Sequence, residues 1–203
     1  MSLVAFASVW LIHLVAAMSP GPSFVVCVRT AVSEGFGTAV ALAIGFGLGA
    51  ALWAATAMAG LALLFELVPA LFAALKFGGA AFLLFIAFMM WRHARDPLPS
   101  TEGAAPRSAA SAIRLGFLTF ASNPKTAVFF GAVFVGLVPA ETPPLVRIAL
   151  IGVIFLNETL WYLAVARVFS LPRARTAYAR LKAWIDRAFG SLIALFGLKI
   201  ALS

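Results

Sequence analysis

Six long stretches of mostly apolar residues follow one another along this chain, and they limit its possible folds more than any other feature. They lie at 3–32, 37–64, 67–91, 111–137, 146–169 and 184–202. A helix needs about 20 such residues to cross roughly 30 Å of hydrocarbon. Of all residues, 64% are hydrophobic and 11% are charged, against about 45–50% and about 25% in soluble domains. We therefore expect an all-α membrane protein with six transmembrane helices.

Several function classes do not fit this composition. The formal charge of +8 comes from arginines in short loops between apolar stretches, which does not suggest a nucleic-acid-binding face. Cys27 is the single cysteine, and His13 and His93 stand apart from each other and from any carboxylate cluster. No Ser/His/Asp set or paired carboxylates lie within the stretches. We expect neither an enzyme nor a metal or cofactor site.

The basic residues also predict an orientation. The segments after the first, third and fifth stretches, with the ends flanking them, carry Arg29, Arg92, Arg95, Arg107, Arg114, Arg167, Arg173, Arg175, Arg180, Lys182 and Arg187. The remaining connections carry only Arg147. Cytoplasmic loops are enriched in Lys and Arg, so six spans would place both termini outside the cell.

The two halves of the chain resemble each other. Ser19-Pro20-Gly21-Pro22 in the first stretch matches Ser122-Asn123-Pro124-Lys125 in the fourth, and Phe77-Gly78-Gly79 in the third matches Phe189-Gly190-Ser191 in the sixth. Tandem units of three spans each enter the membrane in opposite directions, as in many secondary transporters. We expect two inverted three-helix repeats at 1–91 and 111–203, joined by a cytoplasmic linker at 92–110.

The Pro motifs break the first and fourth stretches near their middle. Proline ends or kinks a helix, and a break at membrane depth is tolerated only where it is buried in protein or lines a wet cavity. Each break would present a helix N-terminus that attracts an anion such as an amino-acid carboxylate. The predicted substrate-binding residues here are Ser19, Pro20, Gly21, Pro22, Ser23, Asn123, Pro124 and Lys125. The alternative is a pair of structural kinks that bind no ligand.

Charged and amide side chains also lie inside the apolar stretches. Lys125 follows the second break, and Asn157 and Glu158 form a polar island in the fifth stretch. A charge at the bilayer centre costs about 2.5–3.5 kcal/mol on insertion scales, so it normally faces a cavity or a partner. Lys125 and Glu158 are therefore candidates for substrate binding and for coupling to protons, with Asn157 in the same site. The alternative is a static Lys125–Glu158 pair that joins two helices.

The glycines and aromatic residues indicate packing. Gly45 and Gly49 in the second stretch form a close-packing pattern, which we expect to face the broken first span, and Gly78 and Gly79 are expected to pack in the third. Association of two copies through the second stretch is an arrangement that this pattern allows. Most of the Phe and Trp side chains are expected to face lipid or the membrane interface.

These motifs together resemble the LysE/RhtB family of amino-acid exporters. Pro20-Gly21-Pro22 with Gly35, Gly45 and Gly49 resembles the family's N-terminal pattern, and Lys76-Phe77-Gly78-Gly79-Ala80 and Asn123-Pro124-Lys125 resemble its later elements. The resemblance covers nearly the whole chain. Phe82 and Ala87 depart from it, since Tyr and Gly are common at these positions.

The resemblance implies a six-span exporter in the bacterial inner membrane that expels a small amino acid in exchange for protons. Together with the broken spans, it predicts a secondary transporter with alternating access, whose partners are an amino-acid-like substrate, protons and membrane lipid. The alternative is a passive channel for ions or small solutes. A channel would need a continuous polar lining, and the stretches contain few polar residues to supply one.

Overall fold

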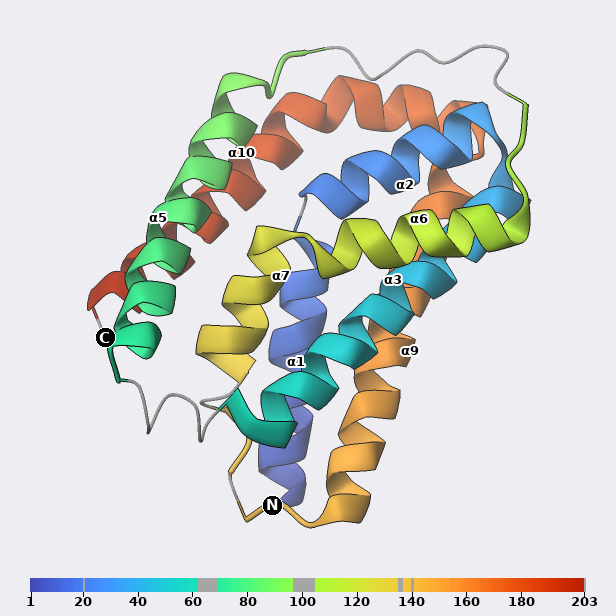
Figure 1. Cartoon of the computed structure of the whole chain (residues 1–203). Helices are drawn as coiled ribbons and strands as arrows, with labels where there is room; N and C mark the ends of the chain where they lie inside the picture. Colours follow the sequence, from blue (N-terminus) through green and yellow to red (C-terminus); the bar gives the residue numbers. More distant parts are fainter. Residues whose placement is uncertain (20, 62–68, 97–104, 135–136, 140, 203) are drawn as a thin grey trace.

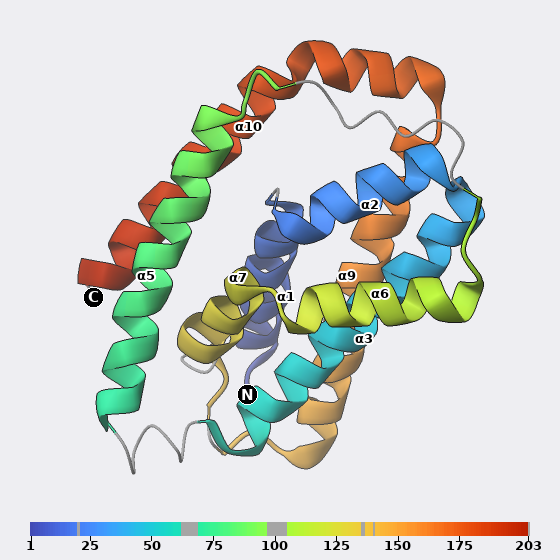
Figure 2. The same ribbon diagram turned by 45° about the horizontal axis from the view of Figure 1, so that its top comes forward.

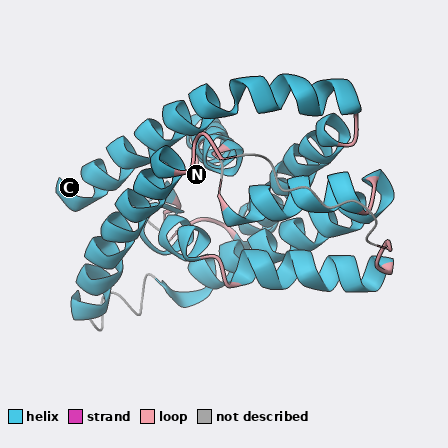
Figure 3. Cartoon of the chain, turned by 90° about the horizontal axis from the view of Figure 1, so that it is seen from above, coloured by secondary structure: helices cyan, strands magenta, loops and turns pink. Residues whose placement is uncertain are grey.

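The computed structural model describes the whole chain except residues 20, 62–68, 97–104, 135–136, 140 and 203. Within the described residues, all regular structure is helical (Figure 3). The helices are α1 (Leu3–Met18), α2 (Pro22–Ser33), α3 (Phe36–Thr56), η1 (Ala57–Leu61), α5 (Pro69–Arg92), α6 (Ala109–Ala121), α7 (Pro124–Val128), η2 (Phe129–Phe134), α9 (Pro144–Phe169) and α10 (Pro172–Leu202). The all-α class expected from the sequence is therefore confirmed.

Prolines and small polar residues fix where the helices begin. Pro22, Pro69, Pro124, Pro144 and Pro172 are each the first residue of a helix. This is the position where proline's missing N–H costs nothing. The Ser2 and Ser108 hydroxyls accept hydrogen bonds from the backbone N–H of Ala5 and Ser111, and so cap α1 and α6.

Fewer helices are both long and apolar enough for a membrane span than the sequence predicts. Phe36–Gly60 and Pro144–Phe169 are long and apolar enough by themselves, and α1 with α2 would form a third span bent by 61°. Among the described residues the remaining helices do not meet that test. At the two breaks the helices are too short to span, because proline splits each apolar stretch into helices of fewer than about 20 residues. Six spans in two inverted repeats therefore remain a prediction.

Helix α3 lies at the centre of the packing, between α6 and α9 (Figure 1). A Cβ atom at Gly45 would clash with the backbone carbonyl of Ile113 in α6, and one at Gly49 would lie 2.9 Å from the Cβ of Phe120. A Cβ at Gly47 would instead clash with Thr159 in α9. The glycine face of α3 thus packs against α6. The expectation that it faces the broken first span was wrong, since periodicity identifies a packing face but not its neighbour.

Helices α5 and α10 run beside each other along one side of the molecule (Figure 2). The Lys182 ammonium joins them by donating to the backbone carbonyls of His93, at 2.9 Å, and Ala94, at 3.4 Å. A Cβ at Gly78 in α5 would meet no described atom within 4 Å, so the close packing expected there is not seen. Gly79 lies outside the residues whose side-chain surroundings are described.

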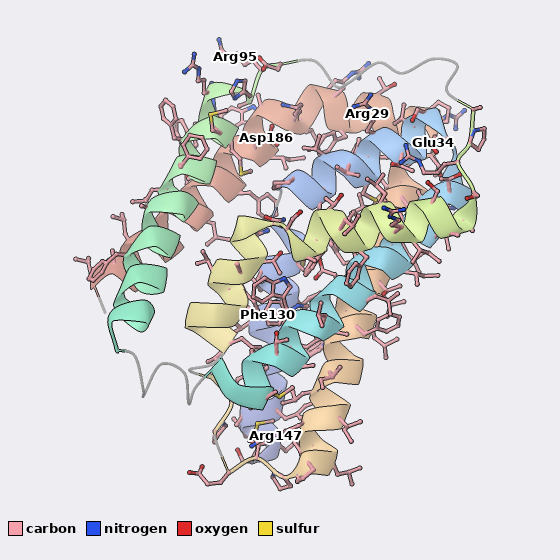
Figure 4. The ribbon with its side chains drawn as sticks, viewed as in Figure 1. Arg29, Glu34, Arg95, Phe130, Arg147 and Asp186 are labelled. Atoms are coloured by element: carbon pink, nitrogen blue, oxygen red, sulfur yellow. The ribbon has the colours of Figure 1, made fainter. Side chains whose placement is uncertain are left out.

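An exposed Arg binds the turn between α2 and α3. The Arg107 guanidinium lies 2.6 Å from Glu34 Oε1, and its Nε and backbone N–H donate to Oε2 at 2.8 Å and 2.9 Å. These hydrogen bonds hold the pKa of Glu34 below its usual value. The contact fixes the segment before α6 to the first half of the chain (Figure 4).

The contact of α3 with α6 predicts a position-specific effect of added methyl groups. Gly45→Ala should lower the melting temperature of the detergent-solubilised protein, because overpacking typically costs about 1–3 kcal/mol. Gly37→Ala in the same helix is the matched control, since its Cβ would meet nothing within 4 Å. It should leave the melting temperature unchanged or raise it slightly. Equal melting temperatures for the two variants would contradict the close contact.

The Glu34–Arg107 pair predicts a dependence of stability on pH. Because the pKa of Glu34 is lower in the folded state, its contribution is full above the pKa of the unfolded state and is lost as pH falls through the folded pKa. Glu34→Gln should therefore lower stability at neutral pH by at most about 1 kcal/mol. The difference from the unmodified protein should shrink towards zero on acidification, measured by thermal unfolding across pH. A difference that grows in acid would have the wrong sign.

Candidate functional site

The two Pro motifs bring together the ends of four helices in the middle of the molecule. Helix α1 ends at Met18 and α2 begins at Pro22, while α6 ends at Ala121 and α7 begins at Pro124. At the second break the Asn123 Oδ1 caps α7 by accepting from the backbone N–H of Lys125 at 3.0 Å. The Asn123 Nδ2 donates to the hydroxyl of Ser23, in the first turn of α2, at 3.3 Å. The N-termini of α2 and α7 thus converge.

The Lys125 ammonium binds the other end of the first break. Its Nζ donates to the backbone carbonyls of Ser19 at 2.7 Å and Ala16 at 3.0 Å, at the C-terminus of α1. The Ala16 carbonyl also accepts from the Ser19 backbone N–H at 3.3 Å and from the Ser19 hydroxyl at 2.8 Å. The helix dipole makes this end of α1 partly negative. The lysine stem passes Gly21, where a Cβ atom would lie 3.5 Å from Lys125 Cδ. A side chain of the second break therefore satisfies the freed backbone of the first.

Helices α9 and α1 contribute a second cluster of polar side chains. Glu158 is 2% exposed, and its Oε2 lies 3.6 Å from Nε2 of His13, which is also buried. The other ring nitrogen of His13 lies 3.4 Å from the Asn157 Nδ2, an amide donor. In a neutral ring that accepts at Nδ1, Nε2 carries the hydrogen and points it towards the carboxylate. Asn157 is held in turn by Trp10, whose indole N–H donates to Asn157 Oδ1 at 2.9 Å.

A small cavity lies between these groups. Its volume is about 30 Å³, enough for about two water molecules. The polar lining is Ser23, Asn123, Lys125, Thr126, His13 and Glu158. The apolar lining includes Phe120, Phe129, Phe130 and the Tyr162 ring, and Figure 4 shows Phe130 near the centre of the molecule.

The Lys125 and Glu158 side chains line the same cavity without forming an ion pair. The described residues include both side chains, and no nitrogen–oxygen distance of 4 Å or less joins them. Lys125 is engaged with backbone carbonyls, and Glu158 lies beside His13. The alternative of a static Lys125–Glu158 bridge is therefore not what the geometry shows.

Most of the residues singled out in the sequence meet here. Gly21, Ser23, Asn123, Lys125 and Glu158 line the cavity, and Ser19 contributes its carbonyl to Lys125. Pro22 and Pro124 begin the helices that converge on it. Asn157 lies behind the cavity, against Trp10 and His13. Pro20 lies outside the described residues.

Sequence reasoning missed two contributions to the site. His13 was expected to stand apart from any carboxylate cluster, and it meets none among the described residues. The single carboxylate that α9 brings to it, Glu158, was not foreseen. The place of His13 inside an apolar stretch was the available signal, since ionisable residues at such depth are rarely without a role. Phe129 and Phe130 are exceptions to the expectation that most Phe side chains face lipid, since both are buried in the cavity wall.

Several known proteins are similar in sequence to this chain over almost its whole length. The profile of the LysE type translocator family matches residues 14–203. The threonine efflux protein of Escherichia coli K12 is 34% identical over 99% of both chains. An uncharacterized membrane protein of Haemophilus influenzae is 30% identical over 92% of this chain and 91% of its own. The homoserine/homoserine lactone efflux protein of Salmonella typhimurium is 26% identical over 91% and 89%. No solved structure matches significantly.

The Asn123 contacts predict a stability effect at the second break. Asn123→Ala removes the cap of α7 and the bond to Ser23, and should cost about 1–2 kcal/mol. Ser122→Ala is the matched control, because the Ser122 hydroxyl is exposed and bonds only to the Leu118 carbonyl of its own helix. The measurement is thermal unfolding in detergent. A loss for Ser122→Ala as large as that for Asn123→Ala would contradict the role of the cap.

Proposed function

Because the chain belongs to the LysE type translocator family, we propose that it is a secondary transporter that exports a small amino acid or related metabolite across the bacterial inner membrane. Its relatives include proteins named for efflux of threonine and of homoserine. The observation that carries the proposal is the buried cavity where both breaks meet, which holds one lysine and one glutamate. A zwitterionic amino acid presents one negative and one positive group to such a pair.

Lys125 is the proposed contact for the substrate carboxylate. An ammonium group has three N–H donors, and the Lys125 Nζ uses two of them on the carbonyls of Ala16 and Ser19. The third remains for an anion. The converging N-termini of α2 and α7 add partial positive charge on the same side, and Ser23 and Asn123 supply polar groups at that end.

Glu158 is the proposed contact for the substrate ammonium and the carrier of the coupled proton. A carboxylate that has bound a proton no longer attracts an ammonium group, so proton and substrate exclude each other at Glu158. Release of substrate is thereby linked to uptake of a proton, which is the requirement for antiport. His13, 3.6 Å from the carboxylate, orients it and offers a path for the proton. The aromatic wall of Phe120, Phe129 and Phe130 would contact the apolar part of the substrate.

The cavity volume supports alternating access. A space of about 30 Å³ holds water but no amino acid, so entry requires the surrounding helices to move apart. The packing supports two equivalent halves: α3 contacts α6, while α9 contacts α1 and α2, and α5 pairs with α10. If α1 corresponds to α6, α3 to α9 and α5 to α10, then the α3–α6 contact corresponds to the α9–α1 contact, and the α5–α10 contact corresponds to itself. We propose that two inverted units, 1–91 and 111–203, rock about the site.

Removal of the lysine charge should abolish binding of the carboxylate. In proteoliposomes preloaded with threonine, Lys125→Met should reduce efflux at least about tenfold, since loss of a buried charged partner typically costs 2–5 kcal/mol. Lys182→Met, at the α5–α10 contact, is the control for loss of a positive charge. An unaltered efflux rate for Lys125→Met, in protein whose melting temperature is unchanged, would contradict the assignment of Lys125 as the contact for the substrate carboxylate.

Neutralising the glutamate should separate transport from the proton gradient. Efflux by the unmodified protein should rise when an inward proton gradient is imposed, and Glu158→Gln should lose this response. Glu141→Gln, which removes an exposed carboxylate, should keep it. Saturable flux without any response to pH in the unmodified protein would rule out proton antiport. A steady single-channel conductance in planar bilayers would instead establish the passive channel.

A further inference from the structure

An open groove is lined by residues of α5 and α10, two helices that run beside each other (Figures 1 and 2). Its volume is about 820 Å³, and Leu84, Phe88, Leu195 and Leu198 form its apolar walls. The floor is shallow because small residues bring the two helices together. A Cβ atom at Gly190 would lie 2.7 Å from the Trp91 ring and 3.2 Å from the carbonyl of Ala87.

Positive charge gathers at one end of this groove. Arg92, which lines the groove, is the last residue of α5 and is exposed. Arg187, on α10, lies just before the lining residues Gly190 and Ser191 and contacts Trp91, another residue of the lining. The Arg187 guanidinium carbon sits 5.8 Å from the centre of the Trp91 ring. Its Nε is buried and has no hydrogen-bond partner among the described residues. A donor on a charged group is costly to leave unpaired, so the Arg187 guanidinium would gain from an anion bound at this end.

The distance from Arg187 to the far end of the groove is close to the depth of one leaflet of a bilayer. From Arg187 to Leu198 the helix rises by about 16 Å, close to half of the roughly 30 Å hydrocarbon core. Ser191, Leu195 and Leu198 follow Arg187 at spacings of four, four and three residues and so lie on one face of α10. The groove therefore changes from charged to apolar over the depth at which a phospholipid changes from headgroup to acyl chain.

We propose that this groove binds an anionic glycerophospholipid, with its phosphate at Arg187 and Arg92 and an acyl chain between Phe88, Leu195 and Leu198. Charge complementarity favours a lipid over a second copy of this chain. The protein carries 15 Lys and Arg against 7 Asp and Glu, and among the acidic residues Glu34 and Asp186 are already paired with Arg107 and Lys182. The Lys182 contacts with His93 and Ala94 hold the charged end of the groove together.

Native mass spectrometry of the delipidated full chain tests this directly. Titration with phosphatidylglycerol should show a first lipid bound at least about tenfold more tightly than phosphatidylcholine of the same acyl chains. Arg187→Gln combined with Arg92→Gln should reduce phosphatidylglycerol to the affinity of phosphatidylcholine. Arg29→Gln, which removes an exposed charge on α2, is the matched control and should keep the preference.

Two further arms distinguish the apolar part of the site from its charged end. Ser191→Trp fills the groove without changing charge and should also abolish the preference. Glycerol 3-phosphate, which lacks acyl chains, should not compete at lipid concentrations. Equal binding of the two lipids, or effective competition by glycerol 3-phosphate, would overturn the proposal. So would a dimer mass that Ser191→Trp converts to monomer. The experiment measures lipid binding alone, so its failure leaves the proposed export unaffected.

Discussion

The hydrogen bonds from the Lys125 ammonium to the last carbonyls of α1 are the interaction on which the rest of the site depends. Breaking an apolar segment frees backbone groups that cannot find water in a membrane, so protein must satisfy them. Here the break in one half is satisfied by a side chain at the break in the other. Neither break could be buried in this form without its counterpart, which explains why the Pro motifs meet around one cavity.

The same arrangement determines the electrostatics of the cavity. A lysine and a glutamate line a volume of about 30 Å³ without contacting each other. Each has found a different partner: backbone carbonyls for Lys125 and the His13 ring for Glu158. These contacts hold the two side chains less strongly than a direct Lys125–Glu158 ion pair would, because a carbonyl carries only partial charge and a neutral ring carries none. Neither side chain is therefore paired with the other across the cavity.

The sequence predicted the chemistry of the site better than its geometry. Pro22 and Pro124 correctly indicated the breaks, since the restriction proline places on a helix is local, and the family was identified from the motifs around them. The partner of Lys125 could not be predicted, because it is a backbone carbonyl about a hundred residues away. The burial of His13 and Phe130 at the cavity was not predicted, because a helix that is apolar all round shows no periodicity that marks its protein-facing side. Which face meets protein is decided by neighbouring helices.

The number of membrane spans shows a related limit. Hydropathy sums over a window and does not register that the chain changes direction within it, as it does by 61° between α1 and α2. The segments Phe36–Gly60 and Pro144–Phe169, which contain α3 and α9, are the ones that both sequence and structure support as single spans. In a broken segment, the helix caps and the contacts on either side of the break determine the path of the chain.

The close approach of α3 and α6 has a mechanical consequence. At Gly45 and Gly116 the two backbones touch, with no side chain between them whose rotamer could change. Packed side chains can yield by switching rotamers, but backbone against backbone can only slide or turn as a unit. This contact joins the first half of the chain to the second, so a displacement of α3 relative to α6 would have to slide or turn one backbone on the other.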